Sequence, residues 1–426
     1  NNYKPIDTKN LFEDLNSAAD KALQYKLYEN AITVVKNRDQ ILPIKNYEKE
    51  RIAYVKLGDD SHSTFVSHLQ NYTQVMEVKD DNIDSLMVKL RPFTKVIVGF
   101  HKADGAWKNH DFKANERATL DSIAKYKHII LDVFAKPYSL LPFEDFENYD
   151  ALVVSYQNSE VAQIVSSEII FGAVSSKGKL PVSINNFFPV NHGYQTEKLN
   201  VLGFTTAENV GMSSAKLAQI DPIIQKAIKA KMTPSAQILV AKDGKVVYQK
   251  AFGTPTYESK IKVKNTDLYD TASLTKIIST LPNVMQEFDA GKVNLDTPLS
   301  TMLPDFNTSN KRNITFKELM SHHAQLKAWE PFYKMTLDSL GKPNSAIYSK
   351  IYTPQFSKKV ADSLFIRNDY HQTIIDYIKN SELLPKKEYK YSDFTFILLK
   401  EYLEKKEQQP LDVLAYERFF KPLGMT

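Results

Sequence analysis

Short runs rich in valine and isoleucine alternate with longer helical segments along residues 1–203. Such runs predict β-strands, and the strand candidates are residues 31–36, 51–57, 95–100, 128–134 and 151–156. Helical segments lie between them at residues 11–27, 61–70, 115–125 and 159–171. Strands separated by helices are typical of an α/β domain with a parallel sheet. The first half is therefore predicted to be α/β, with a mainly parallel sheet and flanking helices.

Ligands of parallel sheets usually bind beyond the carboxyl ends of the strands. In this sequence that edge includes the loop of residues 99–111, which carries His101, Asp104, Trp107 and His110. Two histidines with an aspartate between them could bind a metal ion, but a solvated loop is the more common arrangement. A dinucleotide site is disfavoured, because the strand at 51–57 is followed by Gly58-Asp59-Asp60 instead of Gly-x-Gly-x-x-Gly.

The composition excludes several classes of function. The 426 residues include no cysteine, which excludes disulfides, thiolate metal sites and cysteine catalysis. The formal net charge of +5 is small for this length and spread along the chain, so no nucleic-acid partner is expected. No apolar run reaches the roughly 18–20 residues of a membrane helix, so no membrane span is expected. The length suggests two or three domains.

Two motifs bracket the first half of the chain. Residues 28–37 read Tyr-Glu-Asn-Ala-Ile-Thr-Val-Val-Lys-Asn and lead to Ile-Leu-Pro-Ile at 41–44, while residues 178–183 read Gly-Lys-Leu-Pro-Val-Ser. Together they resemble the opening and the close of the C-terminal α/β domain of glycoside hydrolase family 3. In that family a preceding TIM barrel supplies the nucleophilic aspartate, so the resemblance implies a barrel N-terminal to this chain. A retaining glycosidase needs two carboxyl groups beside the sugar bond, and no such pair can be nominated here.

A second domain is expected at residues 211–426, after an α/β domain at 1–195 and a linker at 196–210. Ser213 can cap its first helix. Residues 236–240 and 246–250 flank Asp243-Gly244, which is a strong hairpin signal. A further helix is expected from Ala272 to just before Gly291, kinked at Pro282. The apolar positions expected to face the core are Leu274, Ile277, Ile278, Leu281 and Phe288.

A Ser-x-x-Lys pattern at Ser273 and Lys276 opens this helix. A serine hydroxyl is a weak nucleophile and needs a base within hydrogen-bond reach. Positions i and i+3 of a helix share one face, so Lys276 can lie beside Ser273. The bare pattern is weak evidence, because it begins at six serines, Ser122, Ser176, Ser213, Ser259, Ser273 and Ser339. Only the Ser273 copy follows a predicted hairpin and leads an apolar helical run.

Hairpin, helix and serine together resemble the serine β-lactamase and penicillin-binding-protein fold, in its class C and esterase-like branch. The resemblance covers about residues 210–426 and extends to Leu-Met-Ser-His at 319–322, where relatives usually read Leu-Leu-Thr-His-Thr-Ser-Gly-Leu. This sequence departs from that pattern at His323-Ala324-Gln325. His322 and His323 are adjacent, so they would not face one ligand, and loop packing is favoured over a metal site. The implied domain is α+β, with an antiparallel sheet plus helices.

The triplet Tyr391-Ser392-Asp393 resembles the second motif of that family, Tyr-x-Asn/Asp. The resemblance implies that Ser273 attacks a carbonyl, that Lys276 and Tyr391 share the general-base role, and that Asp393 orients the site. The Ser273 backbone N–H would form half of an oxyanion hole. The third family motif, a Lys-Thr-Gly or His-x-Gly triplet whose strand donates the other N–H, has no match after Asp393. The domain is therefore expected to be incomplete, and loss of one oxyanion donor lowers rates by about 10²–10³.

The two resemblances predict part of a larger bacterial hydrolase, like fusions of a β-N-acetylglucosaminidase with a β-lactamase-like domain. The expected substrate is a small molecule or a glycan of the cell wall or amino-sugar class, and the expected location is the periplasm or cell surface. No cofactor or metal is predicted. The alternative is a non-catalytic module that binds carbohydrate or peptide and supports a glycosidase barrel, which the departure at 323–325 favours.

Overall fold

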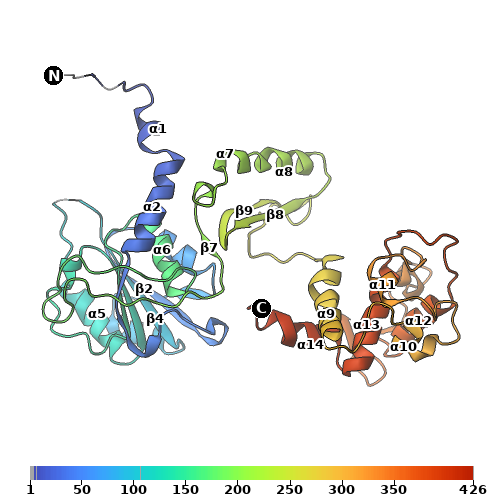
Figure 1. The fold of residues 1–426 in the computed structure, drawn as a ribbon. Coiled ribbons are helices and arrows are strands. Elements are labelled where there is room, and N and C mark those ends of the chain that lie inside the picture. Colours follow the sequence, from blue (N-terminus) through green and yellow to red (C-terminus); the bar gives the residue numbers. More distant parts are fainter. Residues whose placement is uncertain (1–3, 6, 106, 426) are drawn as a thin grey trace. The chain divides into compact units, whose positions relative to one another are not determined.

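The computed structural model describes residues 4–5, 7–105 and 107–425. The chain divides into two compact units, Asn1–Leu268 and Tyr269–Thr426 (Figure 1). Within the described residues, no helix is both long and apolar enough to cross a membrane.

The first unit contains a six-stranded sheet with the order β1-β6-β5-β4-β2-β3. Its strands are β1 (Thr33–Asn37), β2 (Ile52–Gly58), β3 (Val75–Glu77), β4 (Lys95–His101), β5 (His128–Phe134) and β6 (Ala151–Val154). β1 runs antiparallel to β6, and all the other neighbours are parallel. The prediction of a mainly parallel sheet is confirmed, and all five expected strands are present within one or two residues of the predicted bounds.

Helices cover both faces of this sheet because its strands are apolar on both sides. The covering helices are α2 (Ala18–Ala31), α3 (Ser63–Leu69), α4 (Ile83–Leu90), α5 (Ala114–Ala124) and α6 (Glu160–Ile170), whereas α1 (Leu11–Leu15) buries no residue. Alternate strand residues such as Val96 and Ile97 belong to two separate cores. One core includes residues of α4 and α5, and the other includes residues of α2, α3 and α6. Such two-sided burial is typical of a parallel sheet.

Two details of this unit differ from the prediction. The segment at 11–27 is two helices, because the hydroxyl of Ser17 and the carboxylate of Asp20 form a capping box that starts α2. Strand β3 and helix α4 were not predicted. β3 buries only Val75 and exposes Met76 and Glu77, so its sequence carries no strand-like alternation.

A second, three-stranded sheet follows the α/β sheet in the same unit, with the order β7-β9-β8. The predicted hairpin is confirmed as β8 (Ser235–Lys242) and β9 (Lys245–Gly253), and Asp243 and Gly244 both have positive φ in the turn. Ser213 caps α7 (Ser214–Leu217) by accepting a hydrogen bond from the Lys216 N–H, and α8 (Ile220–Lys229) follows. The segment predicted as a linker contains β7 (Gly203–Phe204), which runs parallel to β9.

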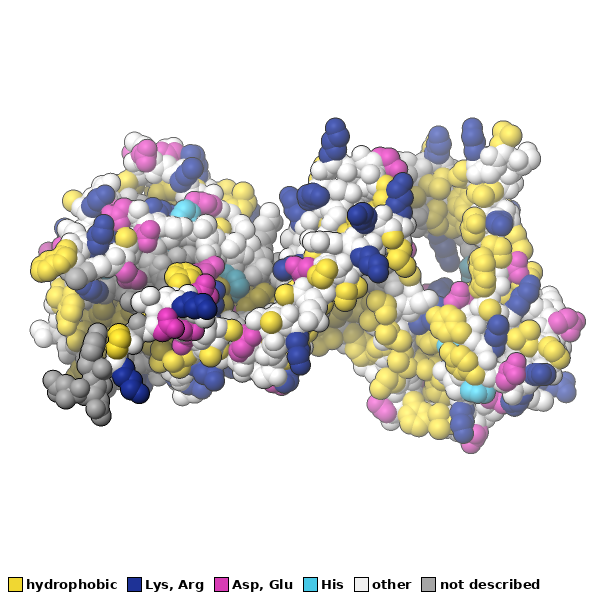
Figure 2. All heavy atoms as spheres, turned by 90° about the horizontal axis from the view of Figure 1, so that it is seen from above, with side chains coloured by type: hydrophobic (Ala, Val, Ile, Leu, Met, Phe, Trp, Pro, Cys, Tyr) yellow, Lys and Arg dark blue, Asp and Glu magenta, His cyan; other side chains and the backbone are white. Residues whose placement is uncertain are grey.

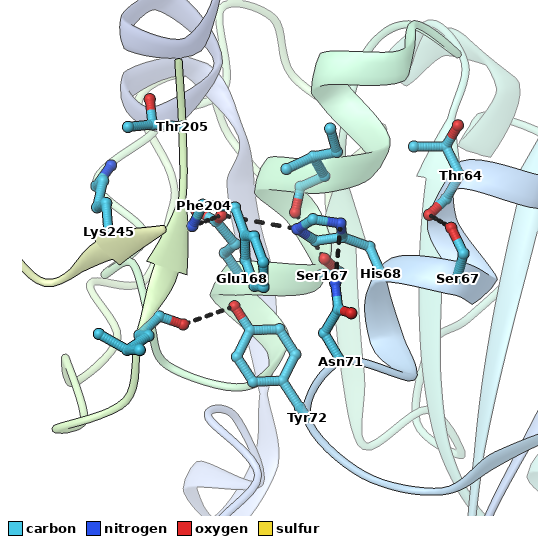
Figure 3. A network of polar contacts seen from close by, with 12 residues as sticks. Thr64, Ser67, His68, Asn71, Tyr72, Ser167, Glu168, Phe204, Thr205 and Lys245 are labelled. Atoms are coloured by element: carbon cyan, nitrogen blue, oxygen red, sulfur yellow. Dashed lines mark hydrogen bonds and ion pairs between the residues drawn. The ribbon is translucent and has the colours of Figure 1, made fainter. Parts of the chain in front are cut away.

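A buried carboxylate ties β7 to the α/β sheet's helices (Figure 3). The N–H groups of Gly203 and Thr205 donate to β9 and its turn, whereas the Phe204 N–H donates to Oε1 of Glu168 on α6, at 2.6 Å. The Phe204 ring packs edge-on against His68 of α3, with 4.5 Å between ring centroids. Burial raises the pKa of Glu168, and hydrogen bonds from His68 and Phe204 partly oppose that rise. β7 thus pairs with β9 along one edge and donates a hydrogen bond to the Glu168 carboxylate from the other edge.

The second unit is built mainly from helices around one core. Its helices are a π-helical turn (Lys276–Thr280), α9 (Leu281–Asp289), α10 (Leu299–Met302), α11 (Phe316–Met320), α12 (Tyr370–Asn380), α13 (Asp393–Glu407) and α14 (Leu411–Ala415). A small antiparallel sheet comprises β10 (Tyr348–Ser349), β12 (Leu364–Ile366) and β11 (Lys358–Ala361). The core draws on α13 most heavily, through Phe394, Leu398, Leu399, Tyr402 and Leu403.

The predicted core face of the helix after Ser273 is wrong at three of its five positions, whereas Leu281 packs against the core as predicted and Ile278 is partly buried. Leu274, Ile277 and Phe288 are 56%, 53% and 44% exposed. Hydrophobic side chains gather on the surface of this unit in the view of Figure 2. The opposite, polar face is buried because Arg418 satisfies it: its guanidinium donates to Asn283 Oδ1 at 3.2 Å and lies 3.8 Å from the Glu287 carboxylate.

We predict that Glu168→Leu releases β7 while Glu168→Gln does not. Glutamine keeps an acceptor for the Phe204 N–H, whereas leucine removes a hydrogen bond to a charged or polar buried group, worth about 1.5–3 kcal/mol. Native-state hydrogen exchange of the Phe204 amide should therefore be roughly 10- to 100-fold faster in the leucine variant. Glu160→Gln, an exposed change in the same helix, is the control. Equal protection in the leucine variant would contradict this account of β7.

Candidate active site

Ser273 lies on a strained turn at the entrance of a helix. The preceding residue, Ala272, has a φ of 43°, a left-handed conformation that is uncommon for a residue with a Cβ atom. Asp270 supports the turn, because its Oδ1 accepts a hydrogen bond from the Ala272 N–H at 2.8 Å. Helical structure then begins at Leu274. Strain of this kind persists only where the surroundings enforce it, and it is concentrated at functional sites.

Lys276 brings the sequence-predicted residues together. Its Nζ lies 3.1 Å from Ser273 Oγ and 2.7 Å from Asp393 Oδ1. The same Nζ lies 5.3 Å from the ring centroid of Tyr391. The structure therefore places all four predicted site residues, Ser273, Lys276, Tyr391 and Asp393, around one ammonium group, while their chemical roles stay predictions.

The other Ser-x-x-Lys copies do not share this arrangement. Within the described residues, Ser273 is the one copy whose lysine donates to its serine hydroxyl. Ser122 instead donates to the Ala118 carbonyl of its own helix, and Ser213 caps α7. Ser176 is buried and donates to the Ile32 carbonyl. The structure thus separates one candidate site from five coincidental patterns.

The protonation of Lys276 is controlled by opposing effects. Burial alone would lower its pKa, but hydrogen bonds and charge attraction from Asp393 and Tyr391 outweigh burial, so the pKa of Lys276 is raised above its ordinary value. At neutral pH the side chain is therefore an ammonium that donates to the Ser273 hydroxyl. Its side chain is 16% exposed and that of Asp393 is 43% exposed, so the pair lies at the edge of solvent.

Buried contacts of Ser392 hold the Tyr391-Ser392-Asp393 triplet in place. The Ser392 hydroxyl donates to the Lys327 carbonyl at 2.6 Å and accepts the Phe394 N–H at 3.2 Å, which caps α13. The Asp393 N–H donates to the Ala328 carbonyl at 2.8 Å. Because Phe394 and Leu398 anchor α13 in the core, Asp393 is presented from a rigid element.

His322 contacts this site, although the sequence indicated only loop packing for it. Its ring lies 4.7 Å from the Tyr391 ring, and its Nδ1 accepts a hydrogen bond from the Ser392 N–H at 3.2 Å. The one sequence feature that pointed to a role for His322 at the site was its place in the motif Leu-Met-Ser-His at 319–322. His323 points elsewhere, with its Nδ1 2.9 Å from the Ser321 carbonyl oxygen.

Gln325 occupies the place where relatives usually have glycine, and it adopts the left-handed backbone that glycine favours, with a φ of 55°. Its main-chain oxygen accepts the Leu384 N–H, and its side-chain amide donates to the Leu384 carbonyl, both at 2.7 Å. Although glycine is replaced here, the backbone at Gln325 therefore has the conformation that glycine favours.

The backbone N–H of Ser273 is available as an oxyanion donor. Within the described part of the chain, no group accepts a hydrogen bond from it. Its place at the entrance of a helix also favours negative charge nearby. No cluster of three or more histidine and carboxylate side chains that could hold a metal ion occurs among the described residues.

Comparisons with known proteins agree with this geometry. Residues 220–426 match the family model described as Beta-lactamase. A protein of Escherichia coli (strain K12), provisionally named a D-alanyl-D-alanine carboxypeptidase, is 28% identical over 244 residues, which are 54% of this chain and 50% of that protein. The N-acetylmuramyl-L-alanine amidase of Bacillus subtilis (strain 168) is 27% identical over 232 residues, covering 51% and 47%. The chain spans about half the length of the curated relatives it matches.

Solved structures of two kinds are similar to parts of the chain. The octameric penicillin-binding protein homologue from Pyrococcus abyssi has a TM-score of 0.38 and 19% identity, covering 49% of this chain and 43% of its own. A family 3 β-N-acetylglucosaminidase from Paenibacillus sp. str. FPU-7 has a TM-score of 0.32 and 12% identity, covering 43% and 36%.

The family match spans the hairpin, the helix led by Ser273 and the Tyr391 triplet. Residues 220–426 are therefore similar to the β-lactamase family of serine hydrolases.

Proposed function

We propose that Ser273 is the nucleophile of an acyl-transfer reaction. The observation that carries the proposal is the 3.1 Å contact between Ser273 Oγ and the Lys276 ammonium, which Asp393 and Tyr391 also contact. Ser273 Oγ attacks the carbonyl carbon of an ester or amide, and the bond to the leaving alcohol or amine breaks. The resulting acyl-serine is then hydrolysed by water.

The raised pKa of Lys276 favours a division of roles between Lys276 and Tyr391. An ammonium that already pairs with Asp393 cannot accept the serine proton, so Tyr391 is the better general base. In this role Tyr391 acts as a phenolate, whose negative charge the Lys276 ammonium stabilises, and it becomes the phenol when it takes the serine proton. Asp393 holds the ammonium in position. The Tyr391 phenol subsequently returns the proton to the leaving group, while the Ser273 N–H stabilises the oxyanion.

The names of the relatives favour a substrate class. D-alanyl-D-alanine carboxypeptidase and N-acetylmuramyl-L-alanine amidase both name an amide of alanine in cell-wall material. We infer that the acyl group received by Ser273 comes from a peptide amide or ester of this class, and that the protein acts outside the cytoplasm.

The first half suggests a wider role for the whole protein. We propose that the chain is part of a hydrolase in which a family 3 glycosidase barrel precedes the α/β domain and acts on amino-sugar or cell-wall glycans. The six-stranded mixed sheet and the motifs at 28–44 and 178–183 support this proposal. The same proposal includes the domain boundaries predicted from the sequence, with an α/β domain at 1–195, a linker at 196–210 and a β-lactamase-like domain at 211–426.

A non-catalytic binding module is the second candidate. The observation that favours it is the replacement of the usual Thr-Ser-Gly by His323-Ala324-Gln325 beside the site. In that case the Ser273 site would bind a cell-wall peptide or glycan without forming an acyl-serine.

The wider proposal predicts that the protein isolated from its source cells is much larger than the 48.7 kDa of this chain. Intact-mass spectrometry measures this directly. A mature mass near 48.7 kDa would contradict a preceding barrel.

Labelling by a fluorophosphonate probe tests the acyl-transfer proposal. The wild-type chain should form a covalent adduct, and Ser273→Ala should abolish it, because the probe reacts only with an activated serine. Ser122→Ala is the matched control, since Ser122 also precedes a lysine by three positions and is partly exposed on a helix. Equal labelling of wild type and Ser273→Ala would exclude Ser273 as nucleophile, and peptide binding without labelling would favour the non-catalytic candidate.

Tyr391→Phe tests the assignment of the general base. Removing the phenol oxygen should slow probe labelling by about 10²–10⁴-fold, the usual contribution of a positioned acid–base group. Tyr389→Phe is the control, because Tyr389 also packs on His322 but is exposed and two residues away. Rates are measured under pseudo-first-order conditions, and a Tyr391→Phe rate within threefold of wild type would rule out this role.

A further inference from the structure

His322 forms hydrogen bonds on both sides of Tyr391. Its main-chain oxygen accepts the Lys390 N–H at 2.8 Å, and its ring Nδ1 accepts the Ser392 N–H at 3.2 Å. The two residues that flank Tyr391 are thus both fixed to one residue that is about seventy positions away in sequence. Because Ser392 also precedes Asp393, this contact reaches both members of the second motif.

The backbone of His322 is specialised for this double contact. Its φ of 58° is left-handed, a conformation that is uncommon for a residue with a Cβ atom. The ring is packed between aromatic neighbours, 4.7 Å from Tyr391, 5.8 Å from Phe396 and 6.1 Å from Tyr389. This packing fixes the plane in which Nδ1 faces the Ser392 N–H.

We propose that His322 is a positioning residue that holds Tyr391 and Asp393 in their working geometry only while its Nδ1 is unprotonated. This inference rests on the proposed acyl transfer at Ser273. Acceptance at Nδ1 requires the neutral tautomer that carries its proton on Nε2. A second proton on Nδ1 converts the acceptor into a donor that faces another donor, and it adds a positive charge close to Lys276.

The groups around His322 determine the pH at which Nδ1 becomes protonated. Burial lowers the pKa of His322, and the nearby Lys276 and His323 lower it further, while Asp393 opposes them. The titratable aromatic side chains in contact with the His322 ring are Tyr389 and Tyr391. The neutral ring therefore persists at neutral pH, and the hydrogen bond is lost only when the pH falls below the ordinary histidine range of about 6.5.

Two substitutions separate the hydrogen bond from the rest of the side chain. His322→Asn places an amide oxygen where Nδ1 lies, tolerates the left-handed backbone and does not titrate. His322→Gln places its oxygen near the position of Nε2 and does not reach the Ser392 N–H. His323→Asn is the matched control, because His323 is adjacent, exposed and hydrogen-bonded to the Ser321 carbonyl instead.

The test measures fluorophosphonate labelling rates of the full chain from about pH 5 to 8, with circular dichroism at each pH to verify folding. Wild type and His323→Asn should share a fall in rate on the acid side. His322→Asn should label within about threefold of wild type at neutral pH but lack the fall that His322 causes. His322→Gln should label about tenfold more slowly at neutral pH, which is the effect of one net hydrogen bond. The proposal would be overturned if the labelling rate of His322→Asn fell at acid pH as much as that of wild type. It would also be overturned if His322→Gln labelled at the wild-type rate at neutral pH.

A second measurement does not depend on activity. In the chain labelled with ¹⁵N-serine, the Ser392 amide resonance, assigned by its loss in Ser392→Thr, should shift with pH in wild type and stay constant in His322→Asn. If wild type takes no probe but this shift is present, the proposed acyl transfer fails while the His322 contact stands. If the resonance does not titrate, or titrates equally in both proteins, the positioning role is excluded.

Discussion

The ion pair between Lys276 and Asp393 is the interaction on which the candidate site depends. It joins the turn that carries Ser273 to the first residue of α13, over a separation of more than a hundred positions. Each partner is fixed by its own element, Lys276 by the helical turn that starts at Leu274 and Asp393 by the buried start of α13. Because the pair is only partly buried, its stabilising effect is moderate, and its main consequence is geometric. It holds an ammonium group within hydrogen-bond reach of a serine hydroxyl.

A different constraint organises the first unit. Strand β7 has one edge on β9 and the other on the carboxylate of Glu168, so the short segment after the α/β sheet is structured by both of its neighbours. The Lys245 ammonium pairs with Glu29 of α2, which adds a second tie between β9 and the helices of the α/β sheet. The hairpin, whose β-strands belong to the region that matches the β-lactamase family, is therefore held by the α/β domain through polar contacts.

The sequence predicted features that depend on local pattern and missed features that depend on distant contacts. The i, i+3 spacing of Ser273 and Lys276 fixed their proximity, and Asp243-Gly244 predicted the hairpin turn, because both are properties of a few neighbouring residues. The resemblance to known motifs supplied Tyr391 and Asp393. The buried face of the helix after Ser273 was misjudged at Leu274, Ile277 and Phe288. The reason is that Arg418, far along the chain, pairs with Glu287 and Asn283 and makes burial of the polar face possible. The contact of His322 with Ser392 was missed because it requires a left-handed backbone, which composition does not reveal.

The loop from His322 to Gln325 shows why departure from a motif need not change a site. His322 and Gln325 both have positive φ. Gln325 forms hydrogen bonds with Leu384, which precedes Tyr391, and His322 forms them with Lys390 and Ser392, which flank Tyr391. Glycine would adopt the conformation at Gln325 without strain, but it could not supply the amide that donates to the Leu384 carbonyl. The side-chain hydrogen bond therefore offsets part of the strain at Gln325. Such strained backbone persists only where the surrounding contacts enforce it. The contacts of this loop with Leu384, Lys390 and Ser392 favour a site that positions Tyr391 over one that has lost its geometry.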